Sequence, residues 1–302
     1  MRDLWRGDSV RLVVWIASFV LALVLAGFGG VYALSEIRLR DVTRGPAFDH
    51  PIPTDAASIE RGRYIARTRG CFGCHGQQLE GKDFGEQWDW PERAVAPNLA
   101  AYARDHDAAI IEAAVRQGVG ADGRALVSMP SFNFLRLTDD DVAALIAYLR
   151  SAPVVENELP TPRLGWAVRW DFARGAETHI GQWVAEVPPL RVDAEAEPQR
   201  ARGEYLAMTM CNECHGLDVR GQTLYQPPTP DLAIVAAYTR EDFERLIETG
   251  IGAGGRELGL MTLVAPDRFP ELSDADVDAL YAYLSSLQDE PAAQGVFSRP
   301  AR

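Results

Sequence analysis

The stretch CFGCH at residues 71–75 occurs a second time as CNECH at residues 211–215. The two copies contain all four cysteines of the 302-residue chain, and each copy ends in histidine. Two thiols at the C-x-x-C-H spacing can each form a thioether bond to a vinyl group of haem, and the histidine that follows can bind the iron. The sequence therefore predicts two covalently attached haem c groups.

Two other uses of paired cysteines fit this pattern less well. A zinc site can be built from two C-x-x-C pairs, but such pairs usually lie closer in sequence than the roughly 140 residues between these two. A thioredoxin-like redox pair needs a strand–helix–strand context, and neither motif is surrounded by alternating strand and helix patterns. Haem attachment is therefore favoured over a zinc or dithiol site.

An apolar run near the N-terminus, Leu12–Leu34, contains Ser18 as its only plainly polar side chain. About 20 apolar residues are enough to cross a bilayer as a helix, and this run is slightly longer. No second run of that length occurs, so we expect a single crossing by an N-terminal anchor. A cleaved signal peptide with Val31–Ala33 as cleavage site is the alternative, but its apolar core is normally about 7–15 residues long.

The formal net charge of the chain is −13, which makes nucleic acid an unfavourable partner. The charge is uneven along the sequence, because the second half is the more acidic. Four arginines gather just before the first motif, at positions 61, 63, 67 and 69. They form either a solvated helix face or a docking patch for an acidic partner.

Aligned on the two motifs, the chain shows a tandem repeat. The segment GVGADGRALVSM at 118–129 aligns without gaps on GIGAGGRELGLM at 250–261. Shorter matches join 61–64 (RGRY) with 202–205 (RGEY), 97–99 (PNL) with 230–232 (PDL), and 137–149 with 272–284. A repeat of this extent predicts two domains of the same fold.

Helical patterns recur at equivalent places in both repeats. Thr138 and Ser273 are N-cap residues with acidic residues in the next turn, and apolar residues at helical spacing follow each of them. Strand patterns are weak, so we expect an all-α protein with long loops around the haem. Further helices are expected at Ala57–Arg69, Ala108–Gln117, Gln199–Met208 and Glu241–Thr249.

With its C-x-x-C-H motifs, downstream Pro-x-Leu elements, a methionine in a loop and a final helix ending in AYL, the chain resembles the class I cytochrome c family. The arrangement is most similar to dihaem cytochrome subunits of bacterial membrane dehydrogenases and oxidases, although alcohol-dehydrogenase-type subunits usually carry three haems. We expect two tandem class I cytochrome c domains behind a transmembrane helix. The predicted parts are an anchor at 1–34, a tether at 35–56, domains at 57–152 and 199–290, a linker at 153–198 and a tail at 291–302.

The resemblance implies the ligands of each iron. His75 and His215 correspond to the proximal ligands, and Met129 and Met261 occupy the position that supplies a distal thioether sulfur. The proline of each Pro-x-Leu element is expected to accept a hydrogen bond from the proximal histidine. The predicted cofactor-binding residues are Cys71, Cys74, His75, Pro97, Met129, Cys211, Cys214, His215, Pro230 and Met261. His179 is a weaker alternative to one of the methionines.

The remaining segments carry less specific patterns. Tyr64 and Tyr205 are expected in the core, packed on Tyr148 and Tyr283 where the first and last helices of each domain cross. The linker is rich in tryptophan and proline, and it either packs the two domains together or docks on a partner or the membrane interface. Packing between the domains is the favoured use.

Two irons with histidine and methionine ligands have no open position for a substrate, so we expect electron transfer. Covalent haem insertion outside the cytoplasm, implied by the resemblance, places the domains in the periplasm. The expected partners are subunits of a respiratory or photosynthetic complex in the cytoplasmic membrane, a further electron carrier or oxidase, and the lipid bilayer. A haem enzyme, such as a dihaem peroxidase or sulfur-compound dehydrogenase, is the alternative.

Overall fold

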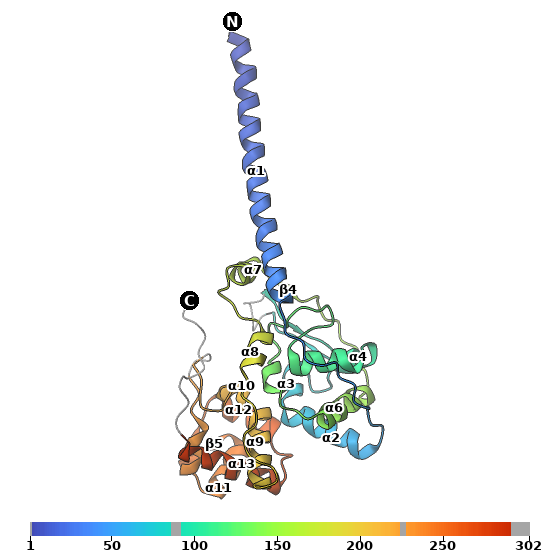
Figure 1. The fold of residues 1–302 in the computed structure, drawn as a ribbon, viewed down its shortest axis with the longest axis vertical. Coiled ribbons are helices and arrows are strands. Elements are labelled where there is room, and N and C mark those ends of the chain that lie inside the picture. The colour runs from blue at the N-terminus through green and yellow to red at the C-terminus, as the bar shows by residue number, and fades with distance from the viewer. Residues whose placement is uncertain (1, 86–91, 224–227, 291–302) are drawn as a thin grey trace.

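Helices dominate the computed structural model, which describes residues 2–85, 92–223 and 228–290, with only the backbone described for residues 2–9 and 92 (Figure 1). The expectation of an all-α protein is confirmed. The predicted tail at 291–302 lies outside the described residues. The strands seen in the described ranges form short antiparallel pairs: β1 (Lys82–Asp83) with β3 (Val95–Ala96), β2 (Glu92–Arg93) with β4 (Arg163–Leu164), and β5 (Ile251–Gly252) with β6 (Arg256–Glu257).

Helix α1 (Arg2–Arg40) projects from the rest of the molecule and contains a segment, Val10–Arg40, that is long and apolar enough to cross a membrane. The helix continues through residues 35–40, which the sequence assigned to the tether, so that assignment was wrong there. Leu39 is 1% exposed, and its carbonyl oxygen accepts a hydrogen bond of 2.6 Å from the backbone N–H of Ala125. The C-terminal end of α1 therefore packs into the globular part of the protein.

The first domain is organised by two helices that cross closely, α2 (Ala56–Thr68) and α6 (Asp139–Ser151). A β-carbon at Gly62 would lie 2.0 Å from the carbonyl oxygen of Ala144, so only glycine permits this crossing. Thr138 caps α6 as predicted, by accepting a hydrogen bond from the N–H of Asp141. The domain also contains α3 (Cys71–His75), α4 (Leu99–Asp105), α5 (Ala108–Glu112), the π-helical turn η1 (Ala113–Gln117) and the 3-10 turn η2 (Ser131–Asn133).

The second domain repeats this plan. Helix α9 (Pro198–Met210) crosses α13 (Asp274–Ser286), and a β-carbon at Gly203 would lie 1.9 Å from the carbonyl oxygen of Ala279. Ser273 caps α13 as predicted. The other elements of this domain are α10 (Asn212–His215), η3 (Leu232–Ala237), α11 (Arg240–Thr249), η4 (Ala253–Gly255), α12 (Leu260–Arg268) and η5 (Leu287–Asp289).

The linker lies mainly on the first domain and on α1. It contains α7 (Trp166–Ala173), which packs against α1, and α8 (Ile180–Glu186), which packs against η1 and η2. In α8, the ring of Trp183 lies 5.4 Å from that of Phe132, measured between centroids. The favoured prediction, that the tryptophan-rich part joins the two domains, is therefore wrong for α7, which lies at the base of the long helix (Figure 1).

Candidate functional site

Each C-x-x-C-H motif forms a short helix, α3 or α10, that follows the first helix of its domain. The chain reverses directly behind the histidine through Gly76 or Gly216, whose φ angles of 83° and 89° are disfavoured for residues with a β-carbon. The glycine five residues further along then donates its N–H to the histidine carbonyl at 2.7 Å in both domains. The repeated glycines therefore form a tight loop that closes on the histidine.

Two non-glycine residues in these loops have left-handed backbones. Leu79 has a φ of 62° and Val219 a φ of 58°, and both side chains are almost completely buried. Each carbonyl accepts a hydrogen bond from the leucine of the Pro-x-Leu element, at 2.9 Å from Leu99 and 3.0 Å from Leu232. Backbone strain of this kind persists only where the surroundings enforce it, and it is concentrated at functional sites.

The imidazole of each motif is oriented by a proline carbonyl. Nδ1 of His75 lies 2.8 Å from the carbonyl oxygen of Pro97, and Nδ1 of His215 lies 3.0 Å from that of Pro230. Because a carbonyl oxygen can only accept, Nδ1 carries the hydrogen and Nε2 keeps its lone pair. Burial lowers the pKa of both histidines, which favours the neutral imidazole that a metal needs as a ligand.

The four cysteines are free thiols and partly buried. Burial raises the pKa of Cys71, Cys211 and Cys214 to about 12, and it also raises the pKa of Cys74. In the described part of the chain, no group of three or more His, Cys, Asp or Glu side chains is arranged to hold a metal ion. The zinc alternative therefore gains no support within the described residues, and the C-x-x-C spacing remains that of thioether attachment.

Met129 and Met261 are both half-buried and pack against the main hydrophobic core. Both segments are held by a hydroxyl that donates to a backbone carbonyl of the preceding helical region: Ser131 to Ala114 at 2.7 Å, and Thr262 to Gly250 at 2.8 Å. Met129 lies in a loop as predicted. Met261 instead lies in the first turn of α12, so the prediction of a loop there is wrong.

The residues present fit a bound haem in each domain. The donor set consists of two thiols, an imidazole with a free Nε2 and a methionine in each repeat. The side-chain amide of Asn133, four residues after Met129, is completely buried and has no hydrogen-bond partner among the described residues. Unsatisfied buried amides are rare in a folded protein, so this amide is suited to a polar group of a bound cofactor.

The other histidines have structural roles. His179 is 2% exposed and caps α8, with Nδ1 accepting a hydrogen bond of 3.3 Å from the N–H of Gln182. His50 pairs with Asp140 at 2.9 Å. His106 is half-buried and stacks on Tyr102 with 4.0 Å between the ring centroids.

The two domains are joined by a reciprocal pair of tyrosine–aspartate hydrogen bonds. The hydroxyl of Tyr64 in the first domain donates to Asp276 in the second at 2.7 Å, and the hydroxyl of Tyr205 in the second donates to Asp141 in the first. Tyr64 and Tyr205 belong to the hydrophobic core as predicted, and their hydroxyls also connect the domains. Each aspartate also accepts from an arginine of its own domain, Arg61 or Arg202.

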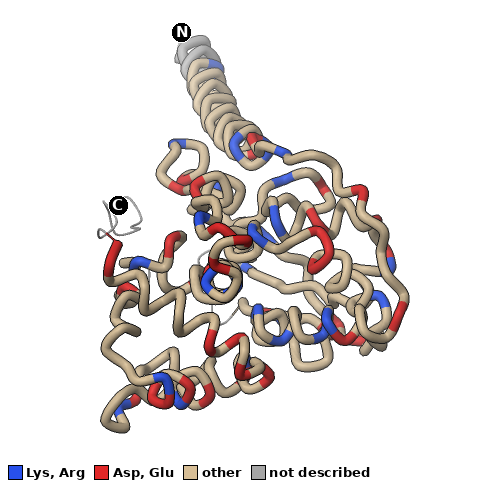
Figure 2. Tube along the Cα trace, turned by 60° about the horizontal axis from the view of Figure 1, so that its bottom comes forward, with Lys and Arg blue, Asp and Glu red and all other residues tan. Residues whose placement is uncertain are grey.

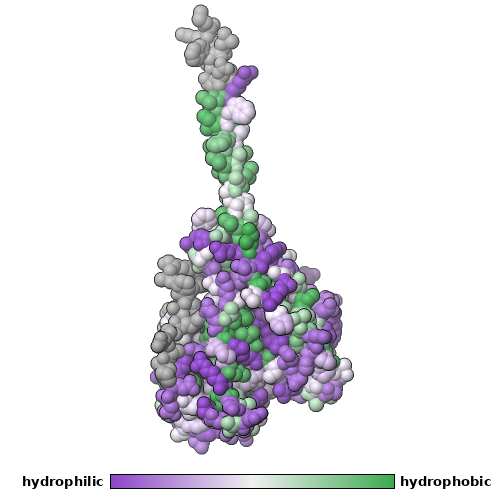
Figure 3. Space-filling model, viewed as in Figure 1, coloured by the Kyte–Doolittle hydropathy of each residue, from purple (hydrophilic) through white to green (hydrophobic). Residues whose placement is uncertain are grey.

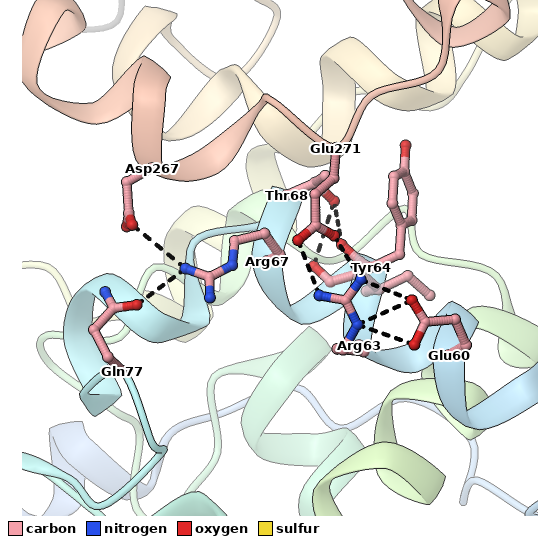
Figure 4. Close-up of polar contacts among 9 residues, drawn as sticks. Glu60, Arg63, Tyr64, Arg67, Thr68, Gln77, Asp267 and Glu271 are labelled. Atoms are coloured by element: carbon pink, nitrogen blue, oxygen red, sulfur yellow. Dashed lines mark hydrogen bonds and ion pairs between the residues drawn. The ribbon is translucent and has the colours of Figure 1, made fainter. Parts of the chain in front are cut away.

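The arginine cluster of α2 binds the acidic second domain (Figure 4). Arg63 pairs with Glu271 at 2.9 Å, and Arg67 lies 3.4 Å from Asp267. Arg69 is 2% exposed and donates to the hydroxyl of Thr209 across the interface at 3.0 Å. Three of the four arginines of the docking patch proposed from the sequence are therefore engaged by the second domain of the same chain, while Arg61 bonds Asp141 of its own domain.

One ion pair lies between the two attachment motifs. Arg268 of α12 bonds Glu213, inside the second motif, at 3.0 Å, and both side chains are mostly buried. A β-carbon at Gly70, just before the first motif, would lie 2.2 Å from the same guanidinium. The guanidinium therefore bonds the second motif and lies against the residue that precedes the first, which places the two motifs close together. In the first domain, Arg136 lies just before the N-cap of α6 and donates to the carbonyls of Val187 and Pro188.

Sequence reasoning missed Asp141, Asp276, Arg268 and Asn133. The two aspartates occupy equivalent positions in the repeat, and the same acid at the same place in both copies was a usable signal of a shared contact.

Comparison with known proteins agrees with this geometry. The family model for cytochrome c matches residues 59–153 and again 200–288. The gluconate 2-dehydrogenase cytochrome c subunit of Pantoea cypripedii is 25% identical over 80% of this chain and 62% of its own length. The fructose dehydrogenase cytochrome subunit of Gluconobacter japonicus is 25% identical over 82% of this chain and 56% of its own.

The cytochrome c subunit of the quinone alcohol dehydrogenase of Gluconobacter oxydans (strain 621H) is 30% identical over 60% of this chain and 39% of its own length. The chain thus spans less than two thirds of each of these relatives. Two matches to one family model, covering more than half of the residues and each containing a C-x-x-C-H helix, show that the chain belongs to the cytochrome c family.

Proposed function

We propose that this chain is a dihaem electron-transfer subunit, anchored by α1 in the bacterial cytoplasmic membrane with both haem domains in the periplasm. It passes single electrons from the catalytic subunit of a dehydrogenase, or another membrane complex, to a further carrier or oxidase. The relatives named above are cytochrome subunits of dehydrogenases, which supports this class of partner. The single observation that carries the proposal is the pair of attachment motifs held close together by Arg268.

When bound, haem supplies an iron that takes up and releases one electron. Cys71 and Cys74 attach the first group, and Cys211 and Cys214 attach the second. His75 and His215 ligate through Nε2, since the proline carbonyls hold Nδ1. We assign Met129 and Met261 as the second protein ligand of each iron, because the two methionines align in the repeat, each lies next to a hydroxyl that donates to the preceding helical region, and thioether sulfur favours ferrous iron.

The interface keeps the two motifs at a constant separation. Its hydrogen bonds and ion pairs join α2 with α9, α12 and α13, so the domains cannot separate without exposing Arg69 and the two aspartates. Separation would also divide the main hydrophobic core, which is one cluster with members from both domains, so a rigid pair of domains is the favoured state. A fixed separation suits electron transfer from one domain to the other.

Carbon monoxide tests the proposal against a haem enzyme with an open iron. The reduced wild-type holoprotein should show no spectral change under carbon monoxide, because both distal positions are filled. The variants Met129→Ala and Met261→Ala should each bind it at one haem. Rapid binding by the wild-type protein would favour the enzyme. Purification in mild detergent, followed by identification of the co-purified subunits, would then name the partner complex.

A further inference from the structure

Helix α7 is fastened to the base of α1 by a small separate core. Val168 and Phe172 lie one turn apart on α7, and together with Leu39 they form a hydrophobic cluster in which each side chain is at most 2% exposed. The linker reaches across to the membrane-proximal end of the molecule to make this contact, as Figure 1 shows. The position of α7 relative to α1 is therefore determined by packing.

Polar contacts reinforce this attachment. Arg169 donates to the hydroxyl of Ser35 and to Glu36, both at 2.9 Å, and its guanidinium lies 4.2 Å from the ring centroid of Tyr32. Glu36 also faces Arg124 of the first domain at 3.4 Å. A partly buried ionic network at this point stiffens the joint between α1 and the first domain.

The other face of α7 carries two exposed tryptophans. Trp166 and Trp170, one helical turn apart, are 43% and 51% exposed. The ring centroids of Trp166 and Phe28 lie 4.4 Å apart. Phe28 belongs to the apolar run of α1 and lies about 9 Å before the end of that run at Leu34, at a rise of 1.5 Å per residue. The exposed tryptophans therefore continue the apolar surface of α1. Figure 3 shows this surface of α1 largely in green.

Charged residues mark where this surface ends. Figure 2 shows α1 without charge along most of its described length and with charged residues at its base. Arg38 and Arg40, in the last turn of α1, are exposed. An apolar helix that ends in aromatic residues followed by arginines is the usual order across the boundary between acyl chains and headgroups.

We propose that α7 lies in the headgroup region of the bilayer, with Trp166 and Trp170 in contact with lipid, and so holds the first domain at a defined orientation to the membrane. This inference rests on the membrane anchor proposed above. The occupant of the tryptophan face is lipid, because the face is continuous with the surface that α1 presents to the bilayer.

Photochemical labelling by lipid tests this assignment on the full-length holoprotein. The protein is placed in vesicles of phosphatidylcholine and phosphatidylglycerol that contain a lipid with a diazirine near its glycerol. After illumination, tryptic peptides are analysed by mass spectrometry. The α7 peptides 164–169 and 170–174 should be labelled at least about tenfold more than peptide 257–268, whose Leu263 is 76% exposed on the second domain.

The α1 peptide 12–38 separates the two possible failures. If this peptide is labelled and the α7 peptides stay at the level of the Leu263 peptide, the anchor stands and the lipid assignment of α7 is overturned, as it would be if a protein subunit covered that face. If the α1 peptide is not labelled, the anchor fails, and the inference about α7 fails with it.

Discussion

The reciprocal tyrosine–aspartate bonds give the interface a sharp test, because a change from tyrosine to phenylalanine removes one hydroxyl and little else. Tyr64 and Tyr205 each donate to an aspartate whose side chain is mostly buried, 14% exposed for Asp276 and 3% for Asp141. A hydrogen bond to a charged group contributes about 1.5–3 kcal/mol, so the double variant Tyr64→Phe/Tyr205→Phe should lose about 3–6 kcal/mol if the bonds are additive.

Denaturant unfolding of the holoprotein in mild detergent measures this loss. The wild-type domains should unfold in one transition, while the double variant should show a lower midpoint and separate transitions for the two domains. Tyr148→Phe is the matched control, since no hydrogen bond from its hydroxyl is seen in the described part of the chain and its ring contact with Phe72 is kept. If the double variant and the control unfold at the same midpoint, the interface does not depend on these bonds.

Three further outcomes are expected. Gly62→Ala should destabilise the holoprotein by about 2 kcal/mol or more in the same unfolding assay, because its β-carbon would meet a backbone carbonyl at 2.0 Å; Gly29→Ala, which meets nothing within 4 Å, should have no such effect. Arg268→Gln should lower the reduction potentials of both haems by tens of millivolts, in order of magnitude, since a nearby positive charge favours the reduced iron. Arg136→Gln, which removes an arginine that donates to the carbonyls of Val187 and Pro188, should leave them unchanged in a potentiometric titration. Although burial acts to raise the pKa of Asp276, the hydrogen bonds from arginine and tyrosine hold it below its usual value. Its contribution to stability is therefore present above its ordinary pKa near 4 and is lost as the pH falls through the lowered value. Unfolding midpoints measured from about pH 6 down to pH 3 should show this loss in the wild-type protein and a smaller one in Asp276→Asn.

Local signals in the sequence predicted much of the fold. Capping residues such as Thr138 and Ser273, and the apolar spacing behind them, placed the last helix of each domain correctly. The expected helix at 57–69 is observed at Ala56–Thr68. These features depend on neighbouring residues, so a single sequence contains them.

The remaining features depend on contacts between distant segments. Glu271 and Asp267 form ion pairs with arginines of α2 only because the second domain packs against the first. No local sequence pattern reveals this packing. Met261 was expected in a loop, but α12 accommodates Pro266 in its interior. Helix α7 has only eight residues, too few for a clear periodicity, and its position is set by α1.

The central claim is that one chain holds two haem groups with histidine and methionine ligands. The most direct measurement is the haem content per chain, combined with near-infrared magnetic circular dichroism of the oxidised holoprotein. The account predicts two haem c per chain, both low-spin with methionine ligation, and the loss of one methionine signal in each of Met129→Ala and Met261→Ala. A single haem per chain, or a wild-type spectrum without methionine ligation, would contradict it.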